Sequence, residues 1–352
     1  MKRRQQFLVI ALLLHLPLFV YPILRLCQWL GMDGWQTATV FVPLFFSQIV
    51  ARLYLRHANS GLIFWLRRAA DLWLGISPLL LGMVLVAELP VAVGWLSGKS
   101  AALTLLAVSF ALLLYSMVNA YSPSVVKVQL SSRKLTSTLR FAQITDVHIG
   151  SRSAAFLERV IQQVNSVNPQ FLCITGDFID APGIGEEQLA ALRDCTAPIY
   201  FSIGNHERYE DLDAIIQCLE RLGVTVLRSR TVALGAVQLI GIDDSEHPSQ
   251  VERELAKLHI DTDRFVLLMY HRPRGLAAAA AAGVDLMISG HTHNGQIVPF
   301  NLVVRRVFEQ TVGHFRDGLT QLYVSPGTGT WGPVMRLGSR GEVTLFEVRP
   351  LT

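Results

Sequence analysis

Five short polar clusters in the C-terminal part of the chain contain side chains that bind metal ions well. Each cluster directly follows a short apolar run. The clusters are Asp146-Val147-His148, Gly176-Asp177, Gly204-Asn205-His206-Glu207, Tyr270-His271 and Gly290-His291-Thr292-His293. A single Asp in such a place is more often a helix cap, and a lone His is usually structural. All five together, in this order, predict a metal centre.

The mixture of donors indicates what such a centre would do. Histidine, carboxylate and amide ligands suit Mn, Fe or Zn, whereas Mg and Ca prefer shells of oxygen alone. Two divalent cations roughly 3.5–4 Å apart neutralise the charge of a phosphate ester and generate hydroxide at neutral pH. Cations this close need a shared anionic ligand, and Asp177 is the natural bridge. The pattern therefore predicts a dinuclear centre for phosphoester hydrolysis, with no nucleophile from the protein.

The elements that carry these clusters have the rhythm of an α/β domain. We expect strands at 139–146, 171–177, 199–205, 237–243, 265–271 and 284–291. We expect helices at 154–167, 186–193, 212–222, 250–258 and 274–282. Strands after the last histidine are expected at 296–299, 322–326 and 342–348. Short apolar runs alternating with helical patterns predict a sheet buried on both faces. Ligands of such sheets gather at the carboxyl ends of the strands, where the five clusters fall.

The ordered series also resembles a known family. Asp146-x-His148, Gly176-Asp177-x-x-Asp180, Gly204-Asn205-His206-Glu207, His271 and Gly290-His291-Thr292-His293 resemble the motifs of the calcineurin-like metallophosphoesterases, over about residues 140–350. The extensions Asn294-Gly295-Gln296 and Gly327-Thr328-Gly329-Thr330-Trp331-Gly332-Pro333 resemble a bacterial branch with membrane-attached phosphodiesterases. That branch is similar to a UDP-diacylglucosamine pyrophosphatase of lipid A synthesis. The resemblance implies a four-layer αββα sandwich of two mixed sheets between helices.

The same resemblance implies a role for each residue. One metal ion would be bound by Asp146, His148, Asp177 and His293. The other would be bound by Asp177, Asn205, His271 and His291. His206 would face the substrate and stabilise the transition state, Asp180 would support His206 or a ligand, and Glu207 would be structural. A metal-bridging hydroxide would attack the phosphorus in line with the leaving oxygen. From their positions alone, Arg208, Tyr209 and Trp331 are candidates for substrate contact.

The composition of the first third of the chain predicts a membrane-spanning region. Charged residues make up only 16% of the sequence, against about 25% in an average globular chain, and the mean hydropathy is +0.37. Four apolar runs, each near the roughly 20 residues that cross a bilayer as a helix, lie at 7–27, 35–55, 72–96 and 101–121. A cleaved signal peptide would explain only the first. We expect four transmembrane helices within 1–121, a linker at 122–139 that contains a short strand at 125–130, and the catalytic domain at 140–350.

The distribution of Lys and Arg predicts the orientation. Most of them precede the first run, separate the second from the third, or follow the fourth. Because cytoplasmic loops are enriched in Lys and Arg, we expect a multi-pass protein of the plasma (inner) membrane with its catalytic domain in the cytoplasm. Arg25, Asp71 and Glu88 lie toward run ends and are expected at the membrane interface. The basic residues do not cluster on one predicted element, so no nucleic-acid partner is expected.

Three functional hypotheses follow. The leading one is hydrolysis of a phosphodiester or pyrophosphate bond in a lipid-linked substrate, because the catalytic domain closely follows the membrane block. The second keeps the enzyme but makes the substrate a soluble nucleotide or cyclic nucleotide. The third is a membrane sensor or transporter with a degenerate phosphoesterase domain, and the complete ligand set argues against it.

Overall fold

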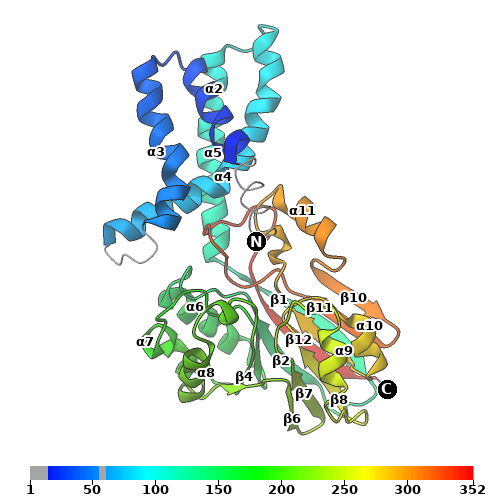
Figure 1. Ribbon diagram of the computed structural model, residues 1–352. Helices are drawn as coiled ribbons and strands as arrows, with labels where there is room; N and C mark the ends of the chain where they lie inside the picture. The colour runs from blue at the N-terminus through cyan, green and yellow to red at the C-terminus, as the bar shows by residue number, and fades with distance from the viewer. Residues whose placement is uncertain (1–14, 55–60, 352) are drawn as a thin grey trace. The chain divides into compact units, whose positions relative to one another are not determined.

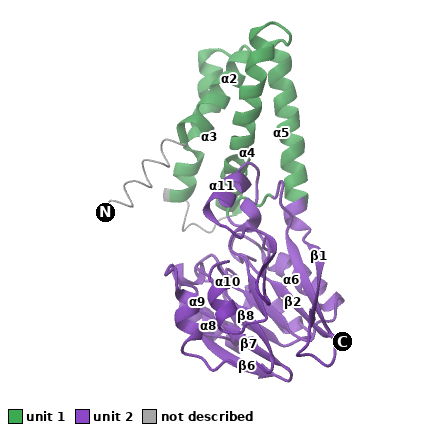
Figure 2. Ribbon diagram, turned by 90° about the vertical axis from the view of Figure 1, so that its right-hand side faces the viewer, with its two compact units in different colours: residues 1–118, 332–335 green, residues 119–331, 336–352 purple. Residues whose placement is uncertain are grey.

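A computed structural model describes residues 15–54 and 61–351 of the 352-residue chain. The chain separates into two compact units, coloured in Figure 2. The first falls within residues 1–118 and includes 332–335, and the second comprises 119–331 and 336–352.

The first unit is helical. Its described helices are α2 (Tyr21–Trp29), α3 (Gly34–Leu53), α4 (Gly61–Ala92) and α5 (Gly98–Tyr121), of which the last turn belongs to the second unit. A reciprocal pair of bonds starts α3: the backbone N–H of Gln36 donates to Asp33 Oδ1 at 2.7 Å, and that of Asp33 donates to Gln36 Oε1 at 3.0 Å. Such a capping box satisfies two N–H groups that a helix start leaves unpaired.

Two of the described helices, α4 and α5, are long and apolar enough to cross a membrane. The expected run at 7–27 begins outside the described residues, and its described part contains the nine-residue α2. The run at 35–55 forms α3, where Gln36, Gln48 and Arg52 reduce the mean hydropathy. The charged groups near the run ends are paired: Arg25 Nε lies 2.6 Å from Glu88 Oε1, and Arg52 Nη2 lies 3.2 Å from Asp71 Oδ1.

The second unit contains two six-stranded sheets (Figure 1). The first has the order β1-β12-β2-β3-β4-β5, parallel except where β12 meets β2. Its strands are β1 (Ser124–Ser132), β2 (Leu139–Ile144), β3 (Leu172–Thr175), β4 (Ile199–Ser202), β5 (Thr225–Val226) and β12 (Glu342–Pro350). The second has the order β10-β11-β9-β8-β7-β6, with antiparallel strands only at its two edges. Its strands are β6 (Arg230–Leu234), β7 (Val237–Gly241), β8 (Phe265–Met269), β9 (Leu286–Ser289), β10 (Gly313–Asp317) and β11 (Thr320–Val324).

Three apolar clusters hold these sheets in layers. The helices of this unit are α6 (Ala154–Ser166), α7 (Glu186–Leu189), α8 (Leu212–Arg221), α9 (Gln250–Leu255), α10 (Leu276–Ala281) and α11 (Phe300–Val307). One cluster joins β2, β3 and β4 to α6 and α8, with Phe156 and Ile174 fully buried. A second fills the space between the sheets, where Phe141 stacks on Phe346 at 4.7 Å. The third joins β7, β8 and β9 to α9 and α10. The unit is therefore a mixed α/β sandwich, layered helix, sheet, sheet, helix.

Most of the expected strands and helices are present, and the exceptions have clear causes. Residues 122–139, expected to be a linker, contain β1, which pairs along its whole length with β12 and so belongs to the sheet. The strand expected at 296–299 is wrong: only an isolated bridge joins Ile297 to Leu337 there, and α11 follows at once. The helix expected at 186–193 divides into a four-residue α7 and a 3-10 turn, Ala190–Asp194.

Candidate metal centre

The seven residues expected to bind metal follow the carboxyl ends of five strands. Asp146 and His148 follow β2, Asp177 follows β3 and Asn205 follows β4 in one sheet. In the other sheet His271 follows β8, and His291 and His293 follow β9. Parallel neighbours end at the same sheet edge, so these loops converge, as the sequence predicted.

Side chains from both sheets meet at one side of this centre. His148 Nε2 lies 3.1 Å from His293 Nε2, which lies 3.3 Å from Asp146 Oδ1. Asp146, His148 and His293 each offer an atom within 4.8 Å of the others. Asp146 and His148 are fully buried. This is a suitable donor set for a divalent cation.

A second set lies on the other side of Asp177. His271 Nε2 lies 3.0 Å from Asp177 Oδ2 and 3.2 Å from His291 Nδ1. Asn205 Oδ1 is buried and has no hydrogen-bond partner among the described residues. A buried acceptor without a donor is costly, and a cation would satisfy it. The donor chemistry therefore fits divalent metal ions, with Asp177 also within reach of His148 and His206.

The backbone of these loops is strained where the donors sit. Asp146, His148, Asp177, His291 and His293 all have positive φ angles, between 49° and 74°. Residues other than glycine rarely adopt this backbone conformation, and each such residue costs on the order of 1–3 kcal/mol. Five such residues among seven expected ligands indicate that the fold maintains an unfavourable backbone to aim these side chains inward.

Glu207 provides much of the restraint on the Asp177 loop. Its Oε1 accepts the backbone N–H groups of Phe178 (2.6 Å) and Ile179 (3.0 Å). Its Oε2 accepts those of Gly204 (2.8 Å) and Asp177 (3.1 Å). Burial and the nearby Asp177 raise the pKa of the Glu207 carboxyl to about 7, against the effect of these N–H donors. Glu207 thus ties the loop after β3 to the loop after β4, as expected of a structural residue.

Further contacts orient the histidines and Asp146. Asp180 Oδ2 lies 3.2 Å from His148 Nδ1, and the carbonyl of Thr175 lies 2.9 Å from His271 Nδ1. The backbone N–H of His291 donates to both carboxylate oxygens of Asp146, at 3.0 and 3.1 Å. Gly290 is required here, because a Cβ at this position would clash with the Asp146 carboxylate. Such outer contacts fix which ring nitrogen faces the metal position.

The electrostatics favour donors in the form that binds metal. Burial holds the pKa values of His291 and His293 well below the usual range, with His271 and His148 as the next causes. Although burial acts to raise the pKa of Asp177, His271 lowers it well below the ordinary value. Burial opposes the imidazolium of His271, but Asp177 outweighs it and raises the His271 pKa to about 10. Asp177 and His271 therefore form an ion pair, and a bound cation would take the place of the proton on His271.

His206 lies next to these donors but is oriented differently. Its backbone N–H donates to Asp177 Oδ1 at 2.8 Å, while its Nε2 lies 4.0 Å from Asp177 Oδ2. Burial lowers the pKa of His206. The rings of Tyr209 and Trp331 lie 5.5 and 6.1 Å from its ring centroid, and both are more than half exposed. A substrate phosphate at His206 would therefore have two aromatic side chains beside it.

The exposed side chain of Arg208 is anchored to the protein by a hydrogen bond. Its Nη1 donates to the carbonyl of Asp244 at 2.8 Å. Asp244 in turn pairs with the buried Arg272, with Nε–Oδ1 at 2.7 Å and Nη2–Oδ2 at 3.1 Å. Arg272 is therefore part of the packed structure next to His271.

The supporting roles of two residues, Gln296 and Arg336, were not predicted from the sequence. The side chain of Gln296 accepts the backbone N–H of Trp331 at 2.9 Å and donates to its carbonyl at 3.1 Å. Arg336 is fully buried, donates to the carbonyls of Pro326, Gly327 and Gly329, and approaches His293 Nδ1 to 3.5 Å. Gln296 is part of the motif Asn294-Gly295-Gln296, but its partner lies 35 residues away. Arg336 had no local signal, since only the folded loop surrounds it with carbonyls.

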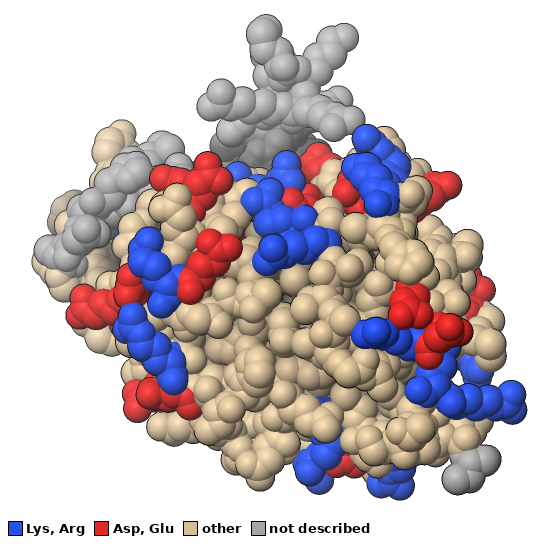
Figure 3. Space-filling view, turned by 90° about the horizontal axis from the view of Figure 1, so that it is seen from below, with Lys and Arg blue, Asp and Glu red and all other residues tan. Residues whose placement is uncertain are grey.

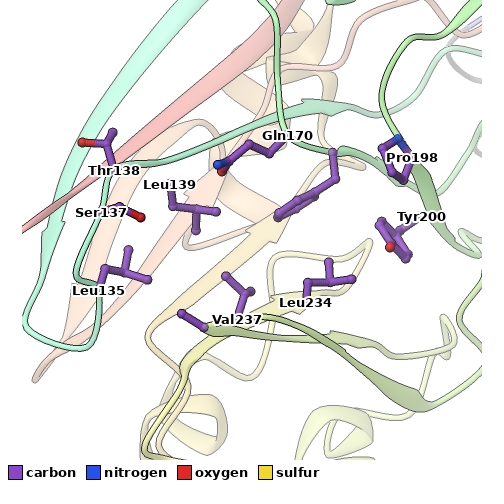
Figure 4. A pocket seen from close by; sticks show the side chains of 11 residues that line it. Leu135, Ser137, Thr138, Leu139, Gln170, Pro198, Tyr200, Leu234 and Val237 are labelled. Carbon is purple, nitrogen blue, oxygen red and sulfur yellow. The ribbon is translucent and has the colours of Figure 1, made fainter.

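A separate cavity of about 300 Å³ lies at the other end of the strands (Figure 4). Its lining comes from residues at or near the starts of β2, β3, β4 and β7, including Leu139, Phe171, Tyr200 and Val237. The lining contains no histidine, aspartate or glutamate. It therefore lacks the groups that the predicted chemistry needs.

The molecular face seen in Figure 3 has Lys and Arg interspersed with Asp and Glu rather than gathered in one basic patch. Among the described pairs, Glu186 contacts both Arg193 (2.6 Å) and Arg221 (2.7 Å), and Arg264 contacts Asp261 at 2.9 Å. Basic charge is thus compensated locally in these places.

Comparisons with known proteins agree with this geometry. A family model described as calcineurin-like phosphoesterase matches residues 139–295. An uncharacterized metallophosphoesterase of Campylobacter jejuni is 30% identical over 260 residues, covering 70% of this chain and 69% of that protein. One of Aquifex aeolicus is 30% identical over 67% of this chain and 95% of its own length. A Danio rerio protein named as a transmembrane protein with metallophosphoesterase domain is 31% identical over 68% of this chain and 60% of its own length.

Proposed function

The chain belongs to the calcineurin-like phosphoesterase family and is a metal-dependent phosphoester hydrolase, and we propose that it cleaves a phosphodiester or pyrophosphate bond in a lipid-linked substrate. One observation carries the lipid part of this proposal. Helix α5, apolar and long enough to span a bilayer, is followed by β1 of the catalytic sandwich after only Ser122 and Pro123. A tether this short would keep the catalytic domain beside the bilayer, where a lipid-linked phosphate is found.

We assign two divalent cations to the centre. Asp146, His148, Asp177 and His293 would hold one, and Asp177, Asn205, His271 and His291 the other. When bound, such cations supply Lewis acidity and lower the pKa of a water molecule. The buried Asn205 Oδ1 and the paired ring nitrogens support this assignment. Manganese, iron and zinc all accept this donor set.

The residues of the chain then divide the remaining work. His206, whose pKa burial lowers, is a neutral imidazole that donates its ring N–H to a phosphoryl oxygen and so stabilises charge developing in the transition state. The bond from its backbone N–H to Asp177 Oδ1 fixes it relative to the shared carboxylate. Asp180 holds His148, and Glu207 holds the Asp177 loop. Preorganised donors of this kind avoid reorganisation during the reaction.

The test compares two presentations of one head group. Full-length protein reconstituted with Mn²⁺ is assayed on phosphodiester and pyrophosphate lipids in vesicles and on the corresponding soluble head groups. We expect much faster cleavage in vesicles, and the His206→Ala variant serves as the inactive control. Equal rates on both forms would refute the lipid-linked substrate while leaving the hydrolase intact.

A soluble nucleotide is the second candidate, and the aromatic rings beside His206 favour it. Tyr209 is 67% exposed and Trp331 58% exposed, although Gln296 fixes the Trp331 backbone. Exposed flat rings next to a phosphate position suit stacking against a base. Nucleotide and cyclic-nucleotide turnover exceeding all lipid turnover would favour this candidate.

We also propose that the membrane block has four spans with both ends in the cytoplasm. The Lys and Arg distribution supports this orientation. Fusions of a reporter that folds only outside the cytoplasm, placed after each apolar run, test it. Reporter activity after the fourth run would place the catalytic domain on the opposite side.

A further inference from the structure

Helix α11 (Phe300–Val307) presents apolar side chains to solvent. Leu302, Val303 and Val307 are 61%, 58% and 62% exposed, and Phe300 is 42% exposed. No residue of α11 is buried. Phe300, Val303 and Val307 follow the i, i+3, i+7 spacing of one helix face, whereas Leu302 lies on the side of Arg305 and Arg306. A surface helix of a globular domain normally turns its apolar stripe toward the core, so the stripe of Phe300, Val303 and Val307 has no partner within the described structure.

Basic charge lies on the same helix. Arg305 and Arg306 occupy its last turn, and no acidic residue lies in its first turn. An apolar face next to Lys or Arg is the pattern of helices that lie in the plane of a membrane interface. With eight residues, α11 is about 12 Å long and far too short to span a bilayer.

We propose that α11 is a membrane-contact helix, which inserts its apolar side chains into the surface of a bilayer that contains anionic lipids. Charge complementarity selects this occupant, because two arginines suit anionic head groups and each contributes roughly a fivefold gain in binding. The chain itself contains α4 and α5, which are suited to crossing a membrane. The apolar face is also small: the side chains of Phe300, Val303 and Val307 fall well short of the roughly 800 Å² per partner of a stable protein interface.

The position of α11 in the chain gives this contact a consequence for the metal centre. The helix begins five residues after the turn His293–Gly295. Gly295 has a φ of +72°, and a Cβ there would clash with the backbone of Asn301, so the turn and the helix start pack closely. The N–H groups of Phe300 and Leu302 donate to the carbonyls of Ile297 and Pro299, at 2.9 and 3.0 Å. When α11 inserts into a bilayer, the loop that contains His291 and His293 therefore lies close to the bilayer surface.

Depth measurement tests the contact directly. The full chain with Cys195→Ser is labelled with a nitroxide at Val303→Cys and reconstituted in vesicles of phosphatidylcholine and phosphatidylglycerol. The other native cysteines are buried. Leu319, which is apolar and 86% exposed, provides the matched control site as Leu319→Cys. We expect the label at 303 to collide with oxygen and to be shielded from a water-soluble nickel complex, and the label at 319 to show the reverse.

The same samples distinguish charge from apolar insertion. With Arg305→Gln and Arg306→Gln, shielding at 303 should weaken most in phosphatidylglycerol, by about 25-fold in the docking equilibrium if the two contributions multiply. A label at 303 as accessible to nickel as the label at 319 would overturn the proposal. So would a label immobilised but still accessible to nickel, which indicates contact with protein.

The catalytic consequence rests on the proposed function and has its own readout. Val303→Ser with Val307→Ser should slow hydrolysis of a vesicle-embedded phosphodiester and leave the rate on bis(p-nitrophenyl) phosphate unchanged. Unchanged rates on both substrates would overturn the link between α11 and catalysis. If the unmodified protein cleaves only the soluble substrate, the lipid-linked substrate fails, while the depth of the label still decides whether α11 contacts the membrane.

Discussion

Replacement of Glu207 by Gln is the sharpest test of how the centre is held together. The fully buried carboxylate accepts four backbone N–H groups, two on each oxygen. Gln keeps the shape of the side chain but replaces one acceptor oxygen by an amide NH₂ group. This group is a donor and would face two backbone N–H donors. Each buried donor left without a partner costs about 1–3 kcal/mol. The change should therefore destabilise the catalytic domain by about 2–6 kcal/mol, a large fraction of a typical stability of about 5–15 kcal/mol.

Two measurements on detergent-solubilised full-length protein check this. We expect the unfolding midpoint of the metal-free Glu207→Gln variant to fall by about 10 °C, since 1 kcal/mol shifts a domain of this size by about 2–4 °C. Bound manganese per chain should also fall, because two of the four N–H groups belong to Gly204 and Asp177 on the ligand loops.

Glu220→Gln is the matched control, since Glu220 is exposed on α8 and such substitutions usually change stability by less than about 0.5 kcal/mol. A Glu207→Gln variant that unfolds at the same temperature as the control and retains its full manganese content would refute this role of Glu207.

Four further outcomes are expected. His206→Ala should lower kcat by about 10²–10⁴-fold with unchanged metal content; an unchanged phenotype of cells that carry the variant would instead support a sensor or transporter with a degenerate domain. Asp177→Asn should lose both metal ions, measured by elemental analysis, because each proposed set includes this carboxylate. In the metal-free protein the pKa of His271 is raised to about 10, above the ordinary value of about 6.5. Its imidazolium therefore stabilises the fold below pH 6.5, and this contribution is lost as pH rises toward 10. Manganese must displace that proton, so calorimetry should show proton release and an affinity that increases with pH over the same window. Gln296→Ala should release the Trp331 backbone and raise KM more than it lowers kcat, while an unchanged KM would remove Trp331 from the substrate site.

The strained ligands link stability to activity in this domain. Five of the expected ligands occupy the left-handed backbone region, which costs free energy that the surrounding hydrogen bonds must offset. Removing a support such as Glu207 therefore affects the fold and the metal centre together. A substitution at the exposed Glu220 should affect neither of them.

The amino-acid sequence alone was enough to predict a metal centre. The proposed ligands could be named from local patterns, because each of them follows a buried strand closely in the chain. They are Asp146, His148, Asp177, Asn205, His271, His291 and His293. Parallel strands place their ends at one edge of a sheet, so a local pattern repeated five times was enough to predict convergence. Hydropathy likewise marked the helices α4 and α5, since their composition is visible without knowing their neighbours.

The tertiary structure decided what depends on residues far apart in the chain. The strand β1 was expected within a linker because its partner β12 lies over 200 residues away. The clamp of Gln296 on Trp331 and the enclosure of Arg336 by three carbonyls exist only after the loops have folded. Helix α11, which has only eight residues, was not predicted, and only the folded structure shows that its apolar side chains are exposed. The sequence shows which functional groups lie next to one another in the chain. Contacts between distant segments depend on how the sheets assemble.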